Sequence, residues 1–243
     1  MAEERLQRAL ARAGFGSRRG CELLISERRV TIDGVVATLG DKVDTGVSSV
    51  RVDGVEVNLD PDVRYYALHK PPGVVTTMRD PQGRPDIRGY LPSDGPRVFP
   101  VGRLDRDSEG LLLLTNDGDL ANRLMHPSHG IEKEYLAEVE GSPTARQLAR
   151  VRSGVRLDDG HARAVRARIV ASSKERGAVR LVMAEGRKRE VRRLLAAVGL
   201  PVTRLVRLRV GPIRLGSMVP GELRLLDRGE VQALVSAAAA VGG

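Results

Sequence analysis

Four consecutive leucines, Leu111–Leu114, stand between polar turn residues: Gly110 precedes them and Asn116–Gly118 follows closely. A short apolar run bounded by turn signals predicts a strand that is buried on both faces. The residues just before it, Arg103–Glu109, are mostly charged. A charged loop fixed to a buried strand holds its side chains rigidly at the edge of a core, and such loops often carry chemistry.

Two amphipathic helices are predicted at the N-terminus. Over residues 3–13 apolar side chains recur at the i, i+3, i+4, i+7 spacing of one helix face, and Gly14 and Gly16 end this helix. Ser17 is expected to cap a second helix. The side chains expected to be buried on the two helices are Leu6, Ala9, Leu10, Ala13, Cys21, Leu24 and Ile25.

Two Asp-Gly pairs, at residues 33–34 and 53–54, each stand between β-branched residues and predict two tight hairpins. The stretch 58–62 is polar, contains proline and lacks periodicity, so we place a domain boundary there. The predicted domains are residues 1–60 and residues 61–243.

Strands and helices are interspersed in the second domain without strict βαβ order, which predicts an α+β fold with a mostly antiparallel sheet. Helices are expected at 118–125, at 143–152 opened by Ser142-Pro143, between Gly186 and Gly199, and after an Asp227/Glu230 capping box. Strands are expected at 64–68, 132–140, 162–170, 178–183 and 203–210, the last with one wet, positive edge. A long basic loop is expected at 79–97.

The charge balance indicates a polyanionic partner. Lys and Arg number 40 against 31 Asp and Glu, a net charge of +9, and both N-terminal helices carry arginine, which favours RNA. Aromatic residues make up only 2%, so base stacking cannot be spread over many rings. The single cysteine, Cys21, excludes an internal disulfide framework. No secretory signal or membrane-length apolar run is present in the sequence, so we expect a cytoplasmic protein.

The first domain resembles an S4 RNA-binding domain over Arg5–Ala37, RLQRALARAGFGSRRGCELLISERRVTIDGVVA. In that family two helices present arginines to structured RNA. The resemblance implies that the RNA-contacting residues are Arg5, Arg8, Arg18, Arg19 and Arg28.

The charged loop Asp105–Gly110 fits several chemistries. Its acids at positions 1, 3 and 5 and its glycine at position 6 match the start of an EF-hand calcium loop. Position 12 is Asn116 instead of glutamate, and a leucine strand stands where a helix should follow, which disfavours calcium. The pair Asp105 and Asp107 could serve hydrolysis or metal-dependent phosphodiester cleavage, but two neighbouring arginines disfavour a divalent metal. A surface salt-bridge loop without chemistry is a further alternative.

The remaining alternative is one carboxylate acting as a nucleophile. Nearby arginine favours its ionised form, and beside a bound nucleotide it could add to C6 of a pyrimidine or to C1′ of the ribose. This chemistry needs no metal, redox cofactor or nucleoside triphosphate. The sequence holds no P-loop, GxGxxG motif, Cys/His cluster or SAM-type glycine loop. We therefore expect no cofactor and no metal, and we interpret His126 and His129 as loop residues.

Four blocks in order resemble the RsuA/RluB group of ribosomal RNA pseudouridine synthases. They are Gly102-Arg103-Leu104-Asp105 with its continuation to Gly118, Lys70-Pro71-Pro72-Gly73, Lys133-Glu134-Tyr135, and Glu185 to Arg193 (EGRKREVRR). A leading S4-like domain also belongs to this group. Two positions depart from its pattern: His69 stands where asparagine is common, and Glu190 where glutamine is common.

The resemblance implies a synthase domain with a central cleft and a role for each matching residue. Asp105 would be the nucleophile that starts cleavage of the N1–C1′ bond, and Arg103 would help displace the target base. Tyr135 would stack on the flipped uracil, and Arg192 would pair with the Asp105 carboxylate. The implied partner is ribosomal RNA. The sequence pattern is closer to that of the large-subunit enzymes, and we expect the enzyme to be a monomer. The rivals are a non-catalytic RNA-binding or ribosome-assembly factor and a metal-dependent RNA nuclease.

Overall fold

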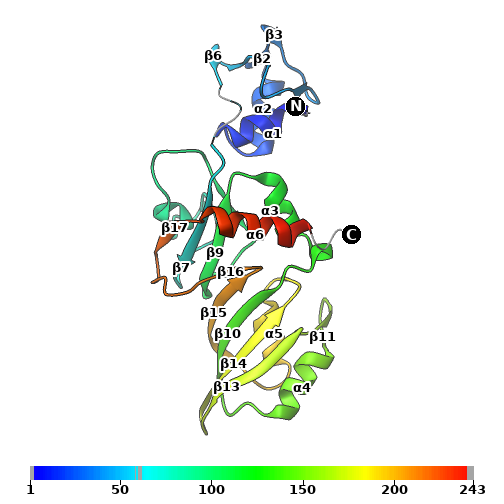
Figure 1. Cartoon of the computed structure of the whole chain (residues 1–243), viewed down its shortest axis with the longest axis vertical. Helices are drawn as coiled ribbons and strands as arrows, with labels where there is room; N and C mark the ends of the chain where they lie inside the picture. The colour runs from blue at the N-terminus through cyan, green and yellow to red at the C-terminus, as the bar shows by residue number, and fades with distance from the viewer. Residues whose placement is uncertain (1–2, 58, 60–61, 240–243) are drawn as a thin grey trace. The chain divides into compact units, whose positions relative to one another are not determined.

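The computed structural model describes residues 3–57, 59 and 62–239, and its contacts divide the chain into two units (Figure 1). One unit holds Met1–Arg64 with Pro92–Phe99 and Thr115–Gly118, and the other holds Tyr65–Leu91, Pro100–Leu114 and Asp119–Gly243. The linker predicted at residues 58–62 falls largely outside the described residues. Its exact position stays a prediction.

The N-terminal unit contains both predicted helices, α1 (Leu6–Arg12) and α2 (Arg18–Ser26). The first helix is shorter than predicted because Glu4–Arg5 forms a strand, β1, that pairs with β4 (Lys42–Val43). Ser17 caps α2 as predicted: its Oγ accepts a hydrogen bond of 3.1 Å from the backbone N–H of Gly20. Leu6, Ala9, Leu10, Cys21 and Ile25 are buried, while Ala13 and Leu24 are partly buried against this core.

Both Asp-Gly hairpins are confirmed. The first joins β2 (Val30–Ile32) to β3 (Val35–Val36), and the second joins β5 (Val50–Val52) to β6 (Val55–Glu56). In each turn the aspartate and the glycine have positive φ, 49° and 85° in the first and 50° and 79° in the second. These angles suit a two-residue turn whose twist matches the strands. The four strands form one sheet in the order β3-β2-β5-β6.

The second unit is built on a nine-stranded sheet in the order β13-β14-β10-β15-β9-β7-β17, with β16 beside β15 and β8 beside β9 (Figure 1). The strands are β7 (Tyr65–Lys70), β8 (Phe99–Val101), β9 (Glu109–Thr115), β10 (Lys133–Glu140), β13 (Arg166–Ser172), β14 (Arg176–Met183), β15 (Val202–Val210), β16 (Ile213–Arg214) and β17 (Leu223–Leu225). Strands β13, β14, β10 and β15 pair antiparallel, whereas β15 runs parallel to β9. The predicted α+β class with a mostly antiparallel sheet is confirmed.

The remaining elements lie around this sheet. They are the short helices η1 (Ile87–Tyr90) and η2 (Pro127–His129), the helices α3 (Gly118–Met125), α4 (Ala145–Ser153), α5 (Glu190–Ala196) and α6 (Arg228–Ala239), and the hairpin of β11 (Val155–Leu157) and β12 (Gly160–Ala162). The predicted capping box of α6 is confirmed by reciprocal hydrogen bonds between Asp227 and Glu230. None of the helices in the described residues has the length and apolar content needed to cross a membrane.

Three predictions about these elements were wrong in detail. Thr144, with Gln147, makes the capping box that opens α4, so the helix does not begin at Ser142-Pro143. The strand predicted to begin at residue 162 begins at Arg166, because β12 pairs with β11 instead. Strand β15 lies inside the sheet, so its Arg207 is buried and not part of a wet edge.

Candidate active site

The predicted nucleophile, Asp105, lies on a turn between β8 and β9. The backbone N–H of Ser108 donates to the Asp105 carbonyl oxygen over 3.0 Å and closes this turn. The neighbours Leu104 and Ser108 are buried, and all seven residues of β9 are buried behind them. The Asp105 side chain is 32% exposed. A carboxylate is thus displayed at the edge of a rigid core, as the leucine run predicted.

The segment Lys70–Thr76 holds the backbone of this turn on both sides of Asp105. Lys70 Nζ donates to the carbonyl oxygen of Ser108 (2.7 Å), and the N–H of Gly73 donates to that of Arg106 (2.7 Å). The Thr76 hydroxyl donates to the carbonyl oxygen of Leu104 over 2.7 Å. The Lys-Pro-Pro-Gly block therefore fixes the turn that carries Asp105, a role that the sequence spacing did not reveal.

Lys70 is fully buried beneath the turn. Burial lowers the pKa of its ammonium group to about 8; the positive charge of Arg207 adds to this, while the acidic groups Asp107, Asp105 and Glu109 oppose it. At neutral pH the group is still mostly charged. It places a positive charge below the predicted nucleophile.

The buried lysine makes stability depend on pH. Because the pKa of Lys70 falls from 10.5 to about 8 on folding, the unfolded chain binds more protons between these values, and this group makes the free energy of unfolding rise with pH there. A Lys70→Met variant should lack that rise. The free energy of unfolding of wild type, minus that of the variant, is expected to increase by up to about 3 kcal/mol from pH 8 to pH 10.5.

Urea unfolding of the two proteins at several pH values measures this difference. The comparison cancels groups that both proteins share, such as Lys133, whose pKa burial also lowers. Parallel stability curves across the window would show that Lys70 is not buried as a titrating cation.

Two arginines from the start of α5 reach the same turn. Arg189 makes two hydrogen bonds to the carboxylate of Asp107, of 2.8 and 2.9 Å, and its Nη1 lies 3.9 Å from the nearer carboxylate oxygen of Asp105. These hydrogen bonds from Arg189 are the main cause that lowers the pKa of Asp107. Asp107, two residues after the predicted nucleophile, thus anchors the arginine nearest to Asp105.

The predicted pairing of Arg192 with the Asp105 carboxylate is wrong. Arg192 instead donates to the carbonyl oxygens of Asp107 (3.0 Å) and Val202 (2.9 Å), and it lies 3.4 Å from the Asp107 carboxylate. The guanidinium nearest to Asp105 belongs to Arg189. The sequence could not separate these arginines because they stand in one basic block.

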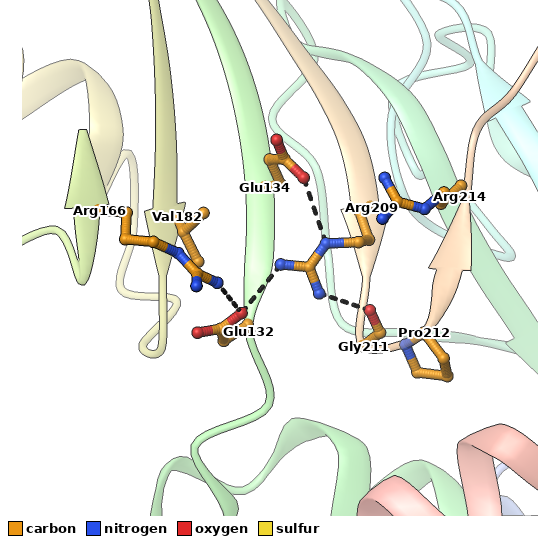
Figure 2. A pocket seen from close by; sticks show the side chains of 8 residues that line it. All are labelled: Glu132, Glu134, Arg166, Val182, Arg209, Gly211, Pro212 and Arg214. Carbon is orange, nitrogen blue, oxygen red and sulfur yellow. Dashed lines mark hydrogen bonds and ion pairs between the residues drawn. The ribbon is translucent and has the colours of Figure 1, made fainter. Parts of the chain in front are cut away.

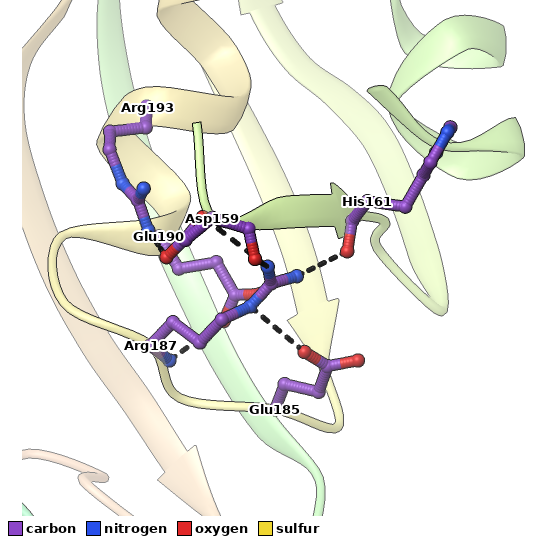
Figure 3. Close-up of polar contacts among 6 residues, drawn as sticks. All are labelled: Asp159, His161, Glu185, Arg187, Glu190 and Arg193. Carbon is purple, nitrogen blue, oxygen red and sulfur yellow. Dashed lines mark hydrogen bonds and ion pairs between the residues drawn. The ribbon is translucent and has the colours of Figure 1, made fainter. Parts of the chain in front are cut away.

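A second set of ion pairs holds the segment that leads into α5. Figure 3 draws the six residues involved: Asp159, His161, Glu185, Arg187, Glu190 and Arg193. Arg187 pairs with the buried Glu190 over 3.2 Å and with Asp159, in the β11–β12 turn, over 3.3 Å. Arg193 pairs with the same Asp159 over 2.7 Å. These contacts fix the position from which Arg189 and Arg192 extend.

Tyr135 belongs to a row that crosses the sheet toward the turn that carries Asp105. It lies opposite Arg207 of β15, which in turn pairs with Gly110 of β9. Directly opposed residues point to the same face of a sheet. Arg207 is 3% exposed and donates to the carbonyl oxygens of Leu111 (2.7 Å) and Arg103 (3.4 Å).

Arg207 therefore links Tyr135 to the turn, and the sequence analysis missed it. The alternation of residues 203–210 placed it on a strand, but only the strand order shows that the strand is internal. The side chain of Arg103, also predicted to act, is exposed. Tyr135 is nearly buried at 8% exposure.

The predicted RNA-contacting arginines of the N-terminal unit are of two kinds. Arg5 donates to the carbonyl oxygen of Gly40, and Arg8 pairs with Glu4 over 3.4 Å, so both have partners in the fold. Three more are exposed, as Arg5 also is: Arg18, Arg19 and Arg28.

The described residues hold no group of three or more His, Cys, Asp or Glu side chains arranged to bind a metal ion. His126 caps η2 and its ring nitrogen lies 2.7 Å from the Ser128 hydroxyl. His129 is the last residue of this short helix and His126 precedes it, so the two histidines do not lie in a plain loop.

Residues 64–197 match the family described as RNA pseudouridylate synthase, and residues 4–48 match the S4 domain. An uncharacterized RNA pseudouridine synthase of Mycobacterium leprae is 49% identical over 234 residues, covering 95% of this chain and 91% of that protein. The ribosomal large subunit pseudouridine synthase B of Bacillus subtilis is 40% identical over 234 residues, covering 95% of each. A crystal structure of a pseudouridylate synthase has a TM-score of 0.66 at 27% identity, covering 95% of this chain and 99% of that one.

The family match spans more than half of the chain, and both relatives span nearly all of it. The sequence resemblance had rested on four short blocks, and the whole-chain identity confirms it independently. This chain is a member of the RNA pseudouridylate synthase family with an S4 domain at its N-terminal end.

Proposed function

We propose that this enzyme isomerises uridine to pseudouridine at specific positions of large-subunit ribosomal RNA, with Asp105 as the nucleophile. One observation carries the mechanism: the Asp105 carboxylate stands partly exposed on a turn whose backbone is fixed on both sides, 3.9 Å from the Arg189 guanidinium. The substrate assignment is supported by relatives named ribosomal large subunit pseudouridine synthase B, at 40% and 44% identity.

The reaction conserves every atom of the substrate. The N1–C1′ bond breaks, the uracil ring turns, C5 bonds to C1′, and the C5 proton leaves while N1 gains one. A carboxylate nucleophile serves by adding to C6 of the base or to C1′ of the ribose and leaving again. Asp105 would start this exchange, and the Arg189 and Lys70 cations would stabilise its negative charge.

The target base must leave its stack to meet Asp105. Flipping costs a few kcal/mol, and stacking on one aromatic ring returns about 1–3 kcal/mol. Tyr135 would be the ring that does this, and its row with Arg207 and Gly110, which leads to the turn of Asp105, supports the role. Arg103 would help displace the target base and hold the flipped nucleotide. Arg192 would act by shaping the turn through the Asp107 backbone.

The S4 domain would supply affinity for the RNA around the target. Its exposed arginines would bind phosphates, which dominate the affinity of such contacts. They are Arg18, Arg19 and Arg28, and Arg5 and Arg8 would contribute after exchanging their present partners. The enzyme would act on ribosomal RNA or an assembly intermediate in the cytoplasm as a monomer.

The test is to map pseudouridines by carbodiimide labelling in large-subunit RNA transcripts, with and without the enzyme. We expect the enzyme to add a small, reproducible set of sites, and full yield to persist in EDTA. Binding without any new pseudouridine would favour the non-catalytic assembly factor. Strand cleavage that EDTA abolishes would favour the nuclease.

A further inference from the structure

A pocket of about 370 Å³ opens on the face of the large sheet opposite to Tyr135. One row across the sheet forms it: Arg214, Arg209, Glu134, Val182 and Arg166, from β16, β15, β10, β14 and β13. Glu134 and Tyr135 are neighbours in β10, and successive side chains of a strand point to opposite faces. A register shift in the pairing with β15 between these two residues sets Arg209 beside Glu134 although Arg207 lies beside Tyr135. The pocket is therefore separate from the candidate active site.

The two carboxylates of the pocket are already occupied by arginines (Figure 2). Glu132 accepts hydrogen bonds from Arg166 (2.7 Å) and Arg209 (2.9 Å). Glu134 accepts one from Arg209 (3.2 Å) and pairs with Arg180 at 3.6 Å. Three arginines and two glutamates line the pocket, so its lining keeps an excess of one positive charge, and Arg180 pairs with Glu134 from outside the lining.

The spare hydrogen-bond donors lie on the two arginines at either side of the pocket in Figure 2. Arg214 is exposed, and its side chain makes no hydrogen bond or ion pair with the rest of the described residues. Arg166 uses one terminal nitrogen on Glu132 and is otherwise 66% exposed. Guanidinium groups bind phosphate oxygens with good geometry, and Val182 between them offers an apolar wall.

We propose that this pocket binds a backbone phosphate of the RNA substrate, outside the region that contacts the flipped nucleotide. The proposal rests on RNA being the substrate of this chain. RNA that reaches both Asp105 and the pocket must pass around the sheet to its other face. A short oligonucleotide cannot do so, whereas a large folded RNA can. The pocket thus adds affinity for large substrates alone.

The test compares the double variant Arg166→Gln/Arg214→Gln with wild type on a long large-subunit RNA fragment and on a short stem-loop that contains the target uridine. Affinity for the long fragment should fall about 10-fold, and the slope of log Kd against log salt should drop by about 1, for the one phosphate contact that is lost. Affinity and pseudouridine yield on the stem-loop should stay within about 2-fold of wild type.

Arg146→Gln/Arg150→Gln is the matched control, because it removes two exposed arginines of α4 with the same loss of charge. It should bind the long fragment within about 2-fold of wild type. Unchanged affinity and salt slope in the pocket variant would overturn the proposal. A second result would also overturn it. If wild type binds inorganic phosphate in calorimetry and the pocket variant does not, but both bind long RNA equally well, the pocket serves a free phosphate compound.

The outcome is independent of the proposed catalytic function. If wild type makes no pseudouridine in large-subunit RNA, the proposed function fails. Selective loss of long-RNA binding by the pocket variant would still support the pocket as a phosphate site.

Discussion

Asp105→Asn is expected to lower the rate of pseudouridine formation by more than about 10³-fold while RNA affinity stays within about 3-fold of wild type. The amide keeps the size of the carboxylate but is a far weaker nucleophile. The turn should keep its shape, because Lys70, Gly73 and Thr76 hold its backbone and none of these contacts uses the Asp105 side chain. Single-turnover release of the C5 proton from uridine-labelled RNA measures the rate, and filter binding measures the affinity.

Asp107→Asn is the control with the same change of charge two residues away. Asp107 holds Arg189 and contacts Arg192, so its loss should loosen both arginines and slow the reaction by about 10-fold without abolishing it. If the two variants lose activity equally, or if Asp105→Asn keeps it, Asp105 is not the nucleophile. A large loss of RNA binding by Asp105→Asn would indicate a binding role instead.

Local rules predicted the parts of this fold that depend on neighbouring residues. The Asp-Gly turns need positive φ at both positions, which few residue pairs tolerate, so those two hairpins were predictable. The leucine run also behaved as predicted and forms the middle of a fully buried strand. Ser17 capped its helix for the same local reason.

Parts that depend on distant residues were not predictable from the pattern. Glu4–Arg5 read as the start of a helix but pair with Lys42–Val43, far along the chain. Arg207 read as a solvated strand residue, but β9 and β10 flank its strand on both sides. Alternation identifies a strand and does not tell whether it lies at the edge of a sheet.

The candidate site shows the same division. A dense charged loop before a buried strand pointed to Asp105, and the family blocks added Tyr135 and the basic helix. Lys70 was noted as part of a block, yet a buried ammonium cannot be distinguished from an exposed one by spacing. Arg189, and not Arg192, lies beside Asp105 because of the way the start of α5 is held. An ion pair between Arg187 and Asp159 of the β11–β12 turn holds it there.

Gly110→Ala is expected to cost about 3 kcal/mol or more of stability and to displace the turn that carries Asp105. Gly110 has φ of 106°, and a Cβ built there would lie 2.4 Å from the carbonyl oxygen and 2.6 Å from the nitrogen of Arg207. Both contacts are with backbone, so no side-chain rotation relieves them. β9 would have to move away from β15 at the parallel pair that carries Arg207.

Gly102→Ala is the matched control, because Gly102 also has positive φ, 79°, but a Cβ there would meet no atom within 4 Å. It should cost only the backbone strain, about 1 kcal/mol. Calorimetry should show the midpoint of unfolding about 10 °C lower for Gly110→Ala and about 3 °C lower for Gly102→Ala. Since the turn moves with β9, Gly110→Ala should also lower kcat by a much larger factor than it lowers the affinity for RNA. Equal midpoints and equal activity in the two variants would mean that the close approach of β9 to Arg207 does not position Asp105.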